Sequence, residues 1–133
     1  MNIVRGTPPN YRAIVAVFPA AARHGVIFTY GTTVYVNGVP QIPTQLKAHE
    51  AVHSQRQGAY GGPEKWWEHY LVDPQFRLTE ELVAHRAEYR TLRHILQNRK
   101  QLAQNLDFIA ERLSSPLYGA MITKQAAKKA ILA

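Results

Sequence analysis

The 133-residue sequence contains no cysteine, and this absence excludes disulfide bridges, thiolate metal sites and a catalytic cysteine. A metal ion would therefore have to be bound by histidine and carboxylate side chains. The sequence also lacks a long apolar run. Its longest, residues 13–22, is interrupted by Pro19 and is far shorter than the roughly 20 residues of a membrane-spanning helix. We therefore expect no transmembrane helix and no membrane partner.

Acidic residues are also scarce. Nine Asp and Glu stand against sixteen Lys and Arg, which gives a formal net charge of +7. The surplus is uneven, because residues 1–85 hold seven basic and six acidic side chains whereas residues 86–133 hold nine and three. A basic surface attracts polyanions, so we expect weak, nonspecific binding of nucleic acid. The competing interpretation is that these scattered charges only solvate helix surfaces.

The N-terminal part of the chain shows strand patterns. Residues 12–18 are rich in Val and Ile and predict a short buried strand that ends at Pro19. Residues 26–30 and 33–36 are β-branched and aromatic runs separated by Gly31-Thr32. This arrangement predicts a β-hairpin.

After Pro40 and Pro43 the apolar residues recur with helical spacing. The expected segments are a helix over residues 44–57, an aromatic segment from Pro63 to Asp73, a long helical pattern over 79–113, and a last helix or tail within 114–133. Strands in residues 1–40 followed by helices in 44–57 and 63–113 indicate the α+β class, in a single domain over residues 1–133.

The segment His49-Glu50-Ala51-Val52-His53 is an HExxH motif on the predicted helix 44–57. Residues four apart on a helix lie one turn apart on the same face, so the two imidazoles can bind one ion. Glu50 lies beside that ion without binding it and can accept a proton from water. The motif therefore predicts a Zn²⁺ site with His49 and His53 as ligands and Glu50 as a catalytic base.

A catalytic zinc ion has three protein ligands, and the continuation typical of metzincins is absent, because Arg56 and Ala59 stand where Gly and His would follow. Of the carboxylates on the next predicted helix, we favour Glu81 as the third ligand. Glu88, Glu80 and His69 are the alternatives, and Glu80 otherwise serves as a first-turn acid. His85 follows Glu81 by one turn and is expected to contact substrate or to support a ligand.

Two stretches of the sequence, HEAVHSQRQ at residues 49–57 and EELVAHRAEY at residues 80–89, resemble the small phage-encoded zincin-like proteins related to the gluzincin metallopeptidases. The resemblance covers roughly residues 26–95. It implies a minimal zincin fold, zinc bound by His49, His53 and Glu81, and Glu50 as general base.

The expected function is a zinc-dependent metallohydrolase of the peptidase class, whose partner is a peptide or protein substrate. His85 or a nearby tyrosine would help to bind the oxyanion. The alternative is a phage structural or assembly component that keeps the zincin fold without turnover, in contact with other phage structural proteins. The implied location is the host cytoplasm or the virion.

Overall fold

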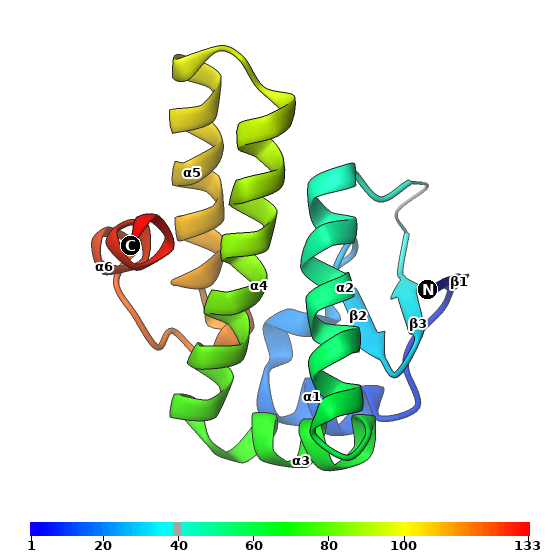
Figure 1. The fold of residues 1–133 in the computed structure, drawn as a ribbon. Helices are drawn as coiled ribbons and strands as arrows, with labels where there is room; N and C mark the ends of the chain where they lie inside the picture. Colours follow the sequence, from blue (N-terminus) through cyan, green and yellow to red (C-terminus); the bar gives the residue numbers. More distant parts are fainter. Residues whose placement is uncertain (39–40) are drawn as a thin grey trace.

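A computed structural model describes residues 1–38 and 41–133, in an α+β arrangement (Figure 1). Pro40, which marks a boundary in the sequence, lies outside the described residues. The elements in chain order are β1 (Asn2–Arg5), α1 (Tyr11–Val17), the 3-10 helix η1 (Pro19–Ala22), β2 (Ile27–Tyr30), β3 (Thr33–Val36), α2 (Thr44–Ala59), α3 (Pro63–Val72), α4 (Pro74–Ile95), α5 (Arg99–Leu113), the 3-10 helix η2 (Pro116–Tyr118) and α6 (Lys124–Leu132).

The three strands form one sheet in the order β1-β3-β2. The predicted hairpin is confirmed: β2 and β3 pair antiparallel, with Tyr30 opposite Thr33. Gly31 starts the tight connection with a φ of +66°, a left-handed conformation that glycine adopts without strain. Strand β1 pairs parallel to β3 and was not predicted, because its four residues are all exposed and show no alternating pattern.

The strand predicted over residues 12–18 is wrong, because this segment forms helix α1. Its Val and Ile content favours a strand, but Ile14 and Phe18 lie four residues apart and are both buried in one core, with Ala21 of η1. Val17, between them, is 47% exposed. Burial along a helical stripe therefore outweighs the β-propensity of single residues.

The predicted helix over residues 44–57 is confirmed as α2, which continues through Gly58 to Ala59. The long pattern over 79–113 is two helices rather than one. Helix α4 begins early, at Pro74, because the Asp73 side chain accepts hydrogen bonds from the backbone amides of Gln75 and Phe76. Asn98 caps the start of α5 in the same way, so the stripe is divided where the chain turns back.

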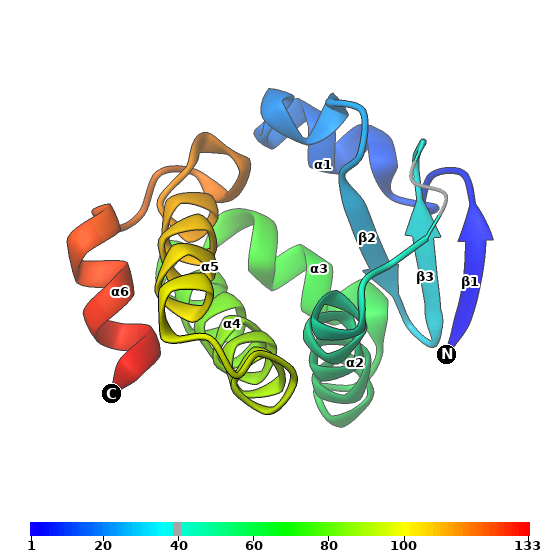
Figure 2. The same cartoon turned by 90° about the horizontal axis from the view of Figure 1, so that it is seen from above.

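Two apolar cores flank the pair α2 and α4. The first joins α1, β2 and α3 around Phe28, Trp66 and Trp67, and the second joins α4, α5 and α6 around Leu106 and Leu113. Seen from above, α3 bridges the two halves, while α2 and α4 run side by side (Figure 2). The two cores thus fix the positions of α2 and α4 relative to each other from both sides.

Within the described part of the chain, the helices are too short or too polar to cross a membrane.

Candidate metal centre

Ionisable side chains fill the interface between α2 and α4, and none of six is more than 6% exposed: His49, Glu50 and His53 from α2, and Glu81, His85 and Glu88 from α4. On α4 the spacing i, i+4, i+7 places its three residues on one stripe, which faces α2. Ionisable groups are costly to bury unless they are paired or bind a metal ion. This interface is therefore the candidate site.

The structure brings the three predicted ligands together. His49 Nε2 lies 3.1 Å from His53 Nε2 and 3.4 Å from Glu81 Oε1, and His53 Nε2 lies 3.2 Å from Glu81 Oε2. Ligand atoms about 2.0–2.1 Å from a tetrahedral zinc ion are about 3.3 Å from one another. The three side chains thus stand at the separations that such an ion requires.

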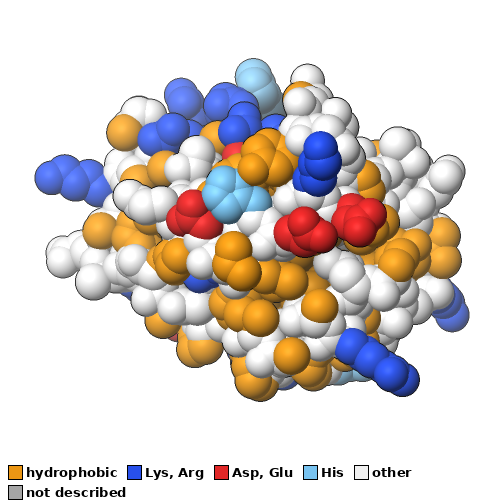
Figure 3. Space-filling model, turned by 90° about the horizontal axis from the view of Figure 1, so that it is seen from below, with side chains coloured by type: hydrophobic (Ala, Val, Ile, Leu, Met, Phe, Trp, Pro, Cys, Tyr) orange, Lys and Arg blue, Asp and Glu red, His pale blue; other side chains and the backbone are white. Residues whose placement is uncertain are grey.

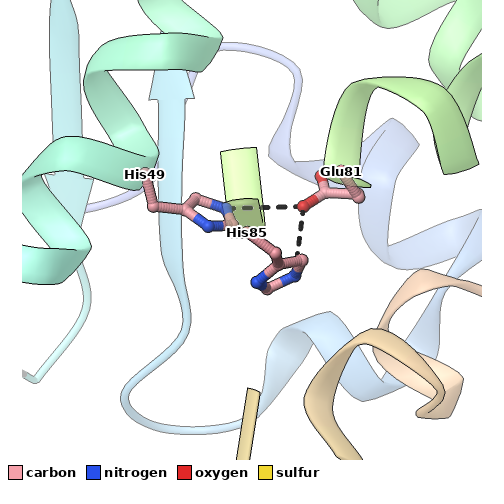
Figure 4. A group of neighbouring side chains, drawn as sticks. All are labelled: His49, Glu81 and His85. Carbon is pink, nitrogen blue, oxygen red and sulfur yellow. Dashed lines mark ion pairs between the residues drawn. The ribbon is translucent and has the colours of Figure 1, made fainter. Parts of the chain in front are cut away.

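His85 adds a further nitrogen to this cluster (Figure 4). Its Nε2 lies 3.8 Å from Glu81 Oε1, and each of these two buried atoms has no hydrogen-bond partner among the described residues. Two buried acceptor atoms that face each other without a hydrogen bond between them are a place that a cation can occupy. The buried group His49, Glu81 and His85 could therefore hold a metal ion.

Glu88 lies behind the imidazoles rather than among the nitrogen atoms that face Glu81. Its Oε1 accepts hydrogen bonds from His49 Nδ1 at 3.2 Å and from His85 Nδ1 at 3.1 Å. Arg112 of α5 donates to the same oxygen at 2.6 Å. With the Nδ1 protons directed to Glu88, Nε2 is the atom that each ring can offer to an ion, in the case of His49 once its Nε2 proton has left. This position suits a residue that orients ligands better than a third ligand.

Glu50 stands beside the cluster. Its Oε1 is 4.0 Å from His49 Nε2, and its Oε2 accepts a 2.6 Å hydrogen bond from the Thr29 hydroxyl of β2. Glu50 is thus held near the candidate ion position by the sheet, as a general base needs to be.

Sequence patterns did not identify two residues that support the site. Gln57 donates to the Thr29 carbonyl and accepts from the Gly31 amide, which ties α2 to the hairpin. Tyr70 of α3 donates to Glu81 Oε2 at 2.6 Å. Gln57 could have been found from its spacing, because it lies one turn after His53 on the same helix. Tyr70 lies on a different helix, and no local sequence pattern relates it to the site.

The other two alternatives for the third ligand lie elsewhere. Glu80 is engaged near the site but not with the imidazoles: it accepts hydrogen bonds from Arg56 of α2 and from Trp66 Nε1 of α3. The expectation that Glu80 is a first-turn acid is wrong, because α4 starts six residues earlier than Glu80, at Pro74. His69 is half-buried on α3 and bonds with Asp73 and Tyr60.

A cavity of about 670 Å³ opens onto the site. Its lining includes His49, Glu50, His53 and Glu81, together with aromatic residues after α1 and on β2 and α3, and residues of α5 and η2. Tyr118 of η2 lines the cavity. His85 is fully buried and does not belong to the lining described here, so it stands behind the ligands and away from the cavity.

The carboxylates on either side of His49 favour the protonated form of its imidazole. Burial by itself lowers the pKa of His49, but the carboxylates of Glu81 and Glu88 raise it to about 10. For Glu81, burial acts upward, yet His53 and His49 hold the pKa well below its usual value. Burial and the nearby charge of His49 lower the pKa of His85 to about 4. His85 is therefore neutral and can offer a lone pair.

Comparisons of the chain with protein-family models, with curated proteins and with solved structures found no match.

Glu81→Gln is expected to weaken zinc binding by more than about 100-fold, because it removes a ligand whereas loss of a supporting residue costs about 10- to 100-fold. The matched control is Glu80→Gln on the next residue of the same helix. It should leave zinc affinity unchanged and lower the Tm, since Glu80 anchors Arg56. Competition with a chromophoric chelator measures the affinity.

The same assay separates the two ligand sets. If zinc is held by His49, His53 and Glu81, His53→Gln should cost far more affinity than His85→Gln. A larger loss for His85→Gln would assign the ion to His49, Glu81 and His85 instead. Equal affinities for Glu81→Gln and Glu80→Gln would refute the site.

Zinc binding near pH 7.5 is expected to release about one proton per ion. With a pKa of about 10, His49 is protonated when no ion is present, and it must lose the Nε2 proton to bind the metal. A zinc titration in weak buffer with a pH indicator gives the number of protons released. Stoichiometric zinc binding without proton release would show that His49 is neutral before the ion arrives.

Proposed function

We propose that this protein is a zinc-dependent hydrolase that cleaves peptide bonds. The observation that carries the proposal is that the Nε2 atoms of His49 and His53 lie 3.1 Å apart and that each is 3.2–3.4 Å from one oxygen of the Glu81 carboxylate. Two imidazoles and one carboxylate are the donor set of a catalytic zinc site, in which the fourth position stays open to water or substrate. Here that open side is the one that faces the cavity. The peptide bond as substrate is the part of the proposal that follows from the resemblance to gluzincins.

When bound, a zinc ion acidifies water and polarises a carbonyl group. The Glu50 carboxylate then accepts a proton from the attacking water and passes it to the leaving amine. Two features support this role. Glu50 lines the cavity, and the hydrogen bond from Thr29 fixes one of its oxygens so that the other is directed to the His49 side.

Tyr118 supplies a hydrogen bond to the oxygen that becomes negative during the reaction. It lines the same cavity as Glu50. Burial of its hydroxyl and the charge of Glu81 raise the pKa of Tyr118 well above the usual value, so the phenol stays protonated and able to donate. The position of His85 behind the ligands suits support of His49 and Glu81 rather than substrate contact.

Glu50→Gln tests the proposal. Glutamine keeps the size of the side chain but cannot accept a proton near neutral pH, so zinc content and Tm should change little. Cleavage should fall by about 10²- to 10⁴-fold. The measurement is the rate of cleavage of a mixture of unstructured peptides, read by mass spectrometry with wild type and variant at equal zinc loading.

Two results would count against a peptidase. If zinc-loaded wild type cleaves no peptide in the mixture and no protein of its source, the alternative of a structural component with a zincin-like site takes its place. If Glu50→Gln loses the ion, Glu50 is a ligand or its direct support, and the assigned base is wrong.

Tyr118→Phe is expected to lower kcat by about 10²-fold with KM nearly unchanged, because the hydroxyl acts on the transition state more than on the bound substrate. Steady-state kinetics on one peptide selected from the mixture measure both constants. A raised KM with an unchanged kcat would mean that Tyr118 only binds substrate.

A further inference from the structure

Most of the basic side chains in the C-terminal third of the described chain have no carboxylate partner. Two of its three acidic residues are engaged: Glu88 by Arg112 within the site, and Asp107 by Lys128. Within the described residues from 86 onward, the basic side chains with no carboxylate within 4.0 Å are Arg86, Arg90, Arg93, Arg99, Lys100, Lys124 and Lys129. Glu111 is the remaining acid.

Three of these residues line one hollow. Arg86, Arg90 and Arg93 follow one another at i, i+4 and i+7 on α4, on a face that also carries Tyr89. Together with the end of α6 they border a depression of about 450 Å³, away from the metal centre. Because the spacing puts the three guanidinium groups on one stripe of a rigid helix, their charges add over a short surface.

The stripe is ordered at one end and free at the other. Arg86 donates from Nε and Nη2 to the carbonyl of Ala130, which fixes α6 beside it. Arg90 and Arg93 are exposed. This arrangement presents two free guanidinium groups beside an anchored third, and arginine forks match phosphate oxygens in geometry.

Acidic side chains gather at the other end of the molecule. The exposed or half-exposed acids Glu64, Glu68 and Asp73 lie on α3 and directly after it. Figure 3 views this end, where red side chains lie near the centre of the face. Helix α4 starts next to α3 and carries the arginine stripe in its second half, so negative and positive charge are separated along α4 (Figure 1). This charge separation orients the protein so that the stripe faces an approaching polyanion.

We propose that the stripe Arg86, Arg90 and Arg93 binds the phosphate backbone of nucleic acid. Seven residues of helix span about 10 Å, which equals the axial distance covered by about three phosphates of one DNA strand at 3.4 Å each. The stripe offers charge and hydrogen-bond donors to phosphate and no set of side chains aimed at base edges. Binding is therefore independent of base sequence and sensitive to salt.

The double variant Arg90→Gln/Arg93→Gln tests the proposal against a control of equal charge, Arg5→Gln/Arg12→Gln, whose residues are exposed at the N-terminal end. The probe is a fluorescent DNA duplex, and anisotropy at several salt concentrations gives the slope of log K against log salt. Each lost phosphate contact lowers that slope by about 0.9, so the α4 variant should lower it by about 2 and the control by much less. Circular dichroism and zinc content should be unchanged in both.

Equal losses in the two double variants would overturn the proposal, because they would show attraction by net charge only. So would wild-type protein that does not bind the duplex at low salt. A parallel assay with vesicles of equal parts phosphatidylcholine and phosphatidylglycerol covers the other polyanion. Binding to vesicles but not to DNA, lost in the α4 variant, would assign the stripe to an anionic membrane surface instead.

Discussion

The imidazole of His49 lies between two carboxylates in the interior, with Glu81 facing its Nε2 and Glu88 facing its Nδ1. Charges of this kind cost several kcal/mol each when they are removed from water, and they are tolerated only where partners surround them. Helices α2 and α4 can therefore pack closely only if each buried charge between them has a partner of opposite charge or a hydrogen bond. Tyr70 and Arg112 contribute to this requirement, because they donate hydrogen bonds to Glu81 and Glu88.

Each helix of the site is held by hydrogen bonds from a neighbouring element. Gln57 ties α2 to the hairpin, Tyr70 connects α3 to Glu81, and Arg112 connects α5 to Glu88. A small domain has little apolar area with which to lock side chains in place. Here the orientation of the ligands is achieved through a second layer of hydrogen bonds, whose donors come from elements on both sides of the helix pair.

Local rules predicted much of the fold and failed where two such rules disagreed. The hairpin around Gly31 and the helix from Thr44 follow from turn chemistry and apolar spacing, and both are present. Over residues 12–18, β-propensity and helical burial of Ile14 and Phe18 point to different structures, and burial prevails. Helix α4 starts earlier than predicted because Asp73 caps it, and the same Asp-Pro pair also ends the preceding helix, α3.

The sequence by itself determined that His49, Glu50 and His53 share one helix, and that Glu81, His85 and Glu88 share a stripe on another, because spacing within a helix depends on backbone geometry alone. Only the tertiary structure decided that Glu81 faces the imidazole Nε2 atoms, that Glu88 lies behind them and that Glu80 pairs with Arg56 and Trp66 instead. The rotation of α4 against α2 depends on core residues far apart in the chain. No local pattern records that rotation, nor does one place Arg112 and Tyr118 beside the site.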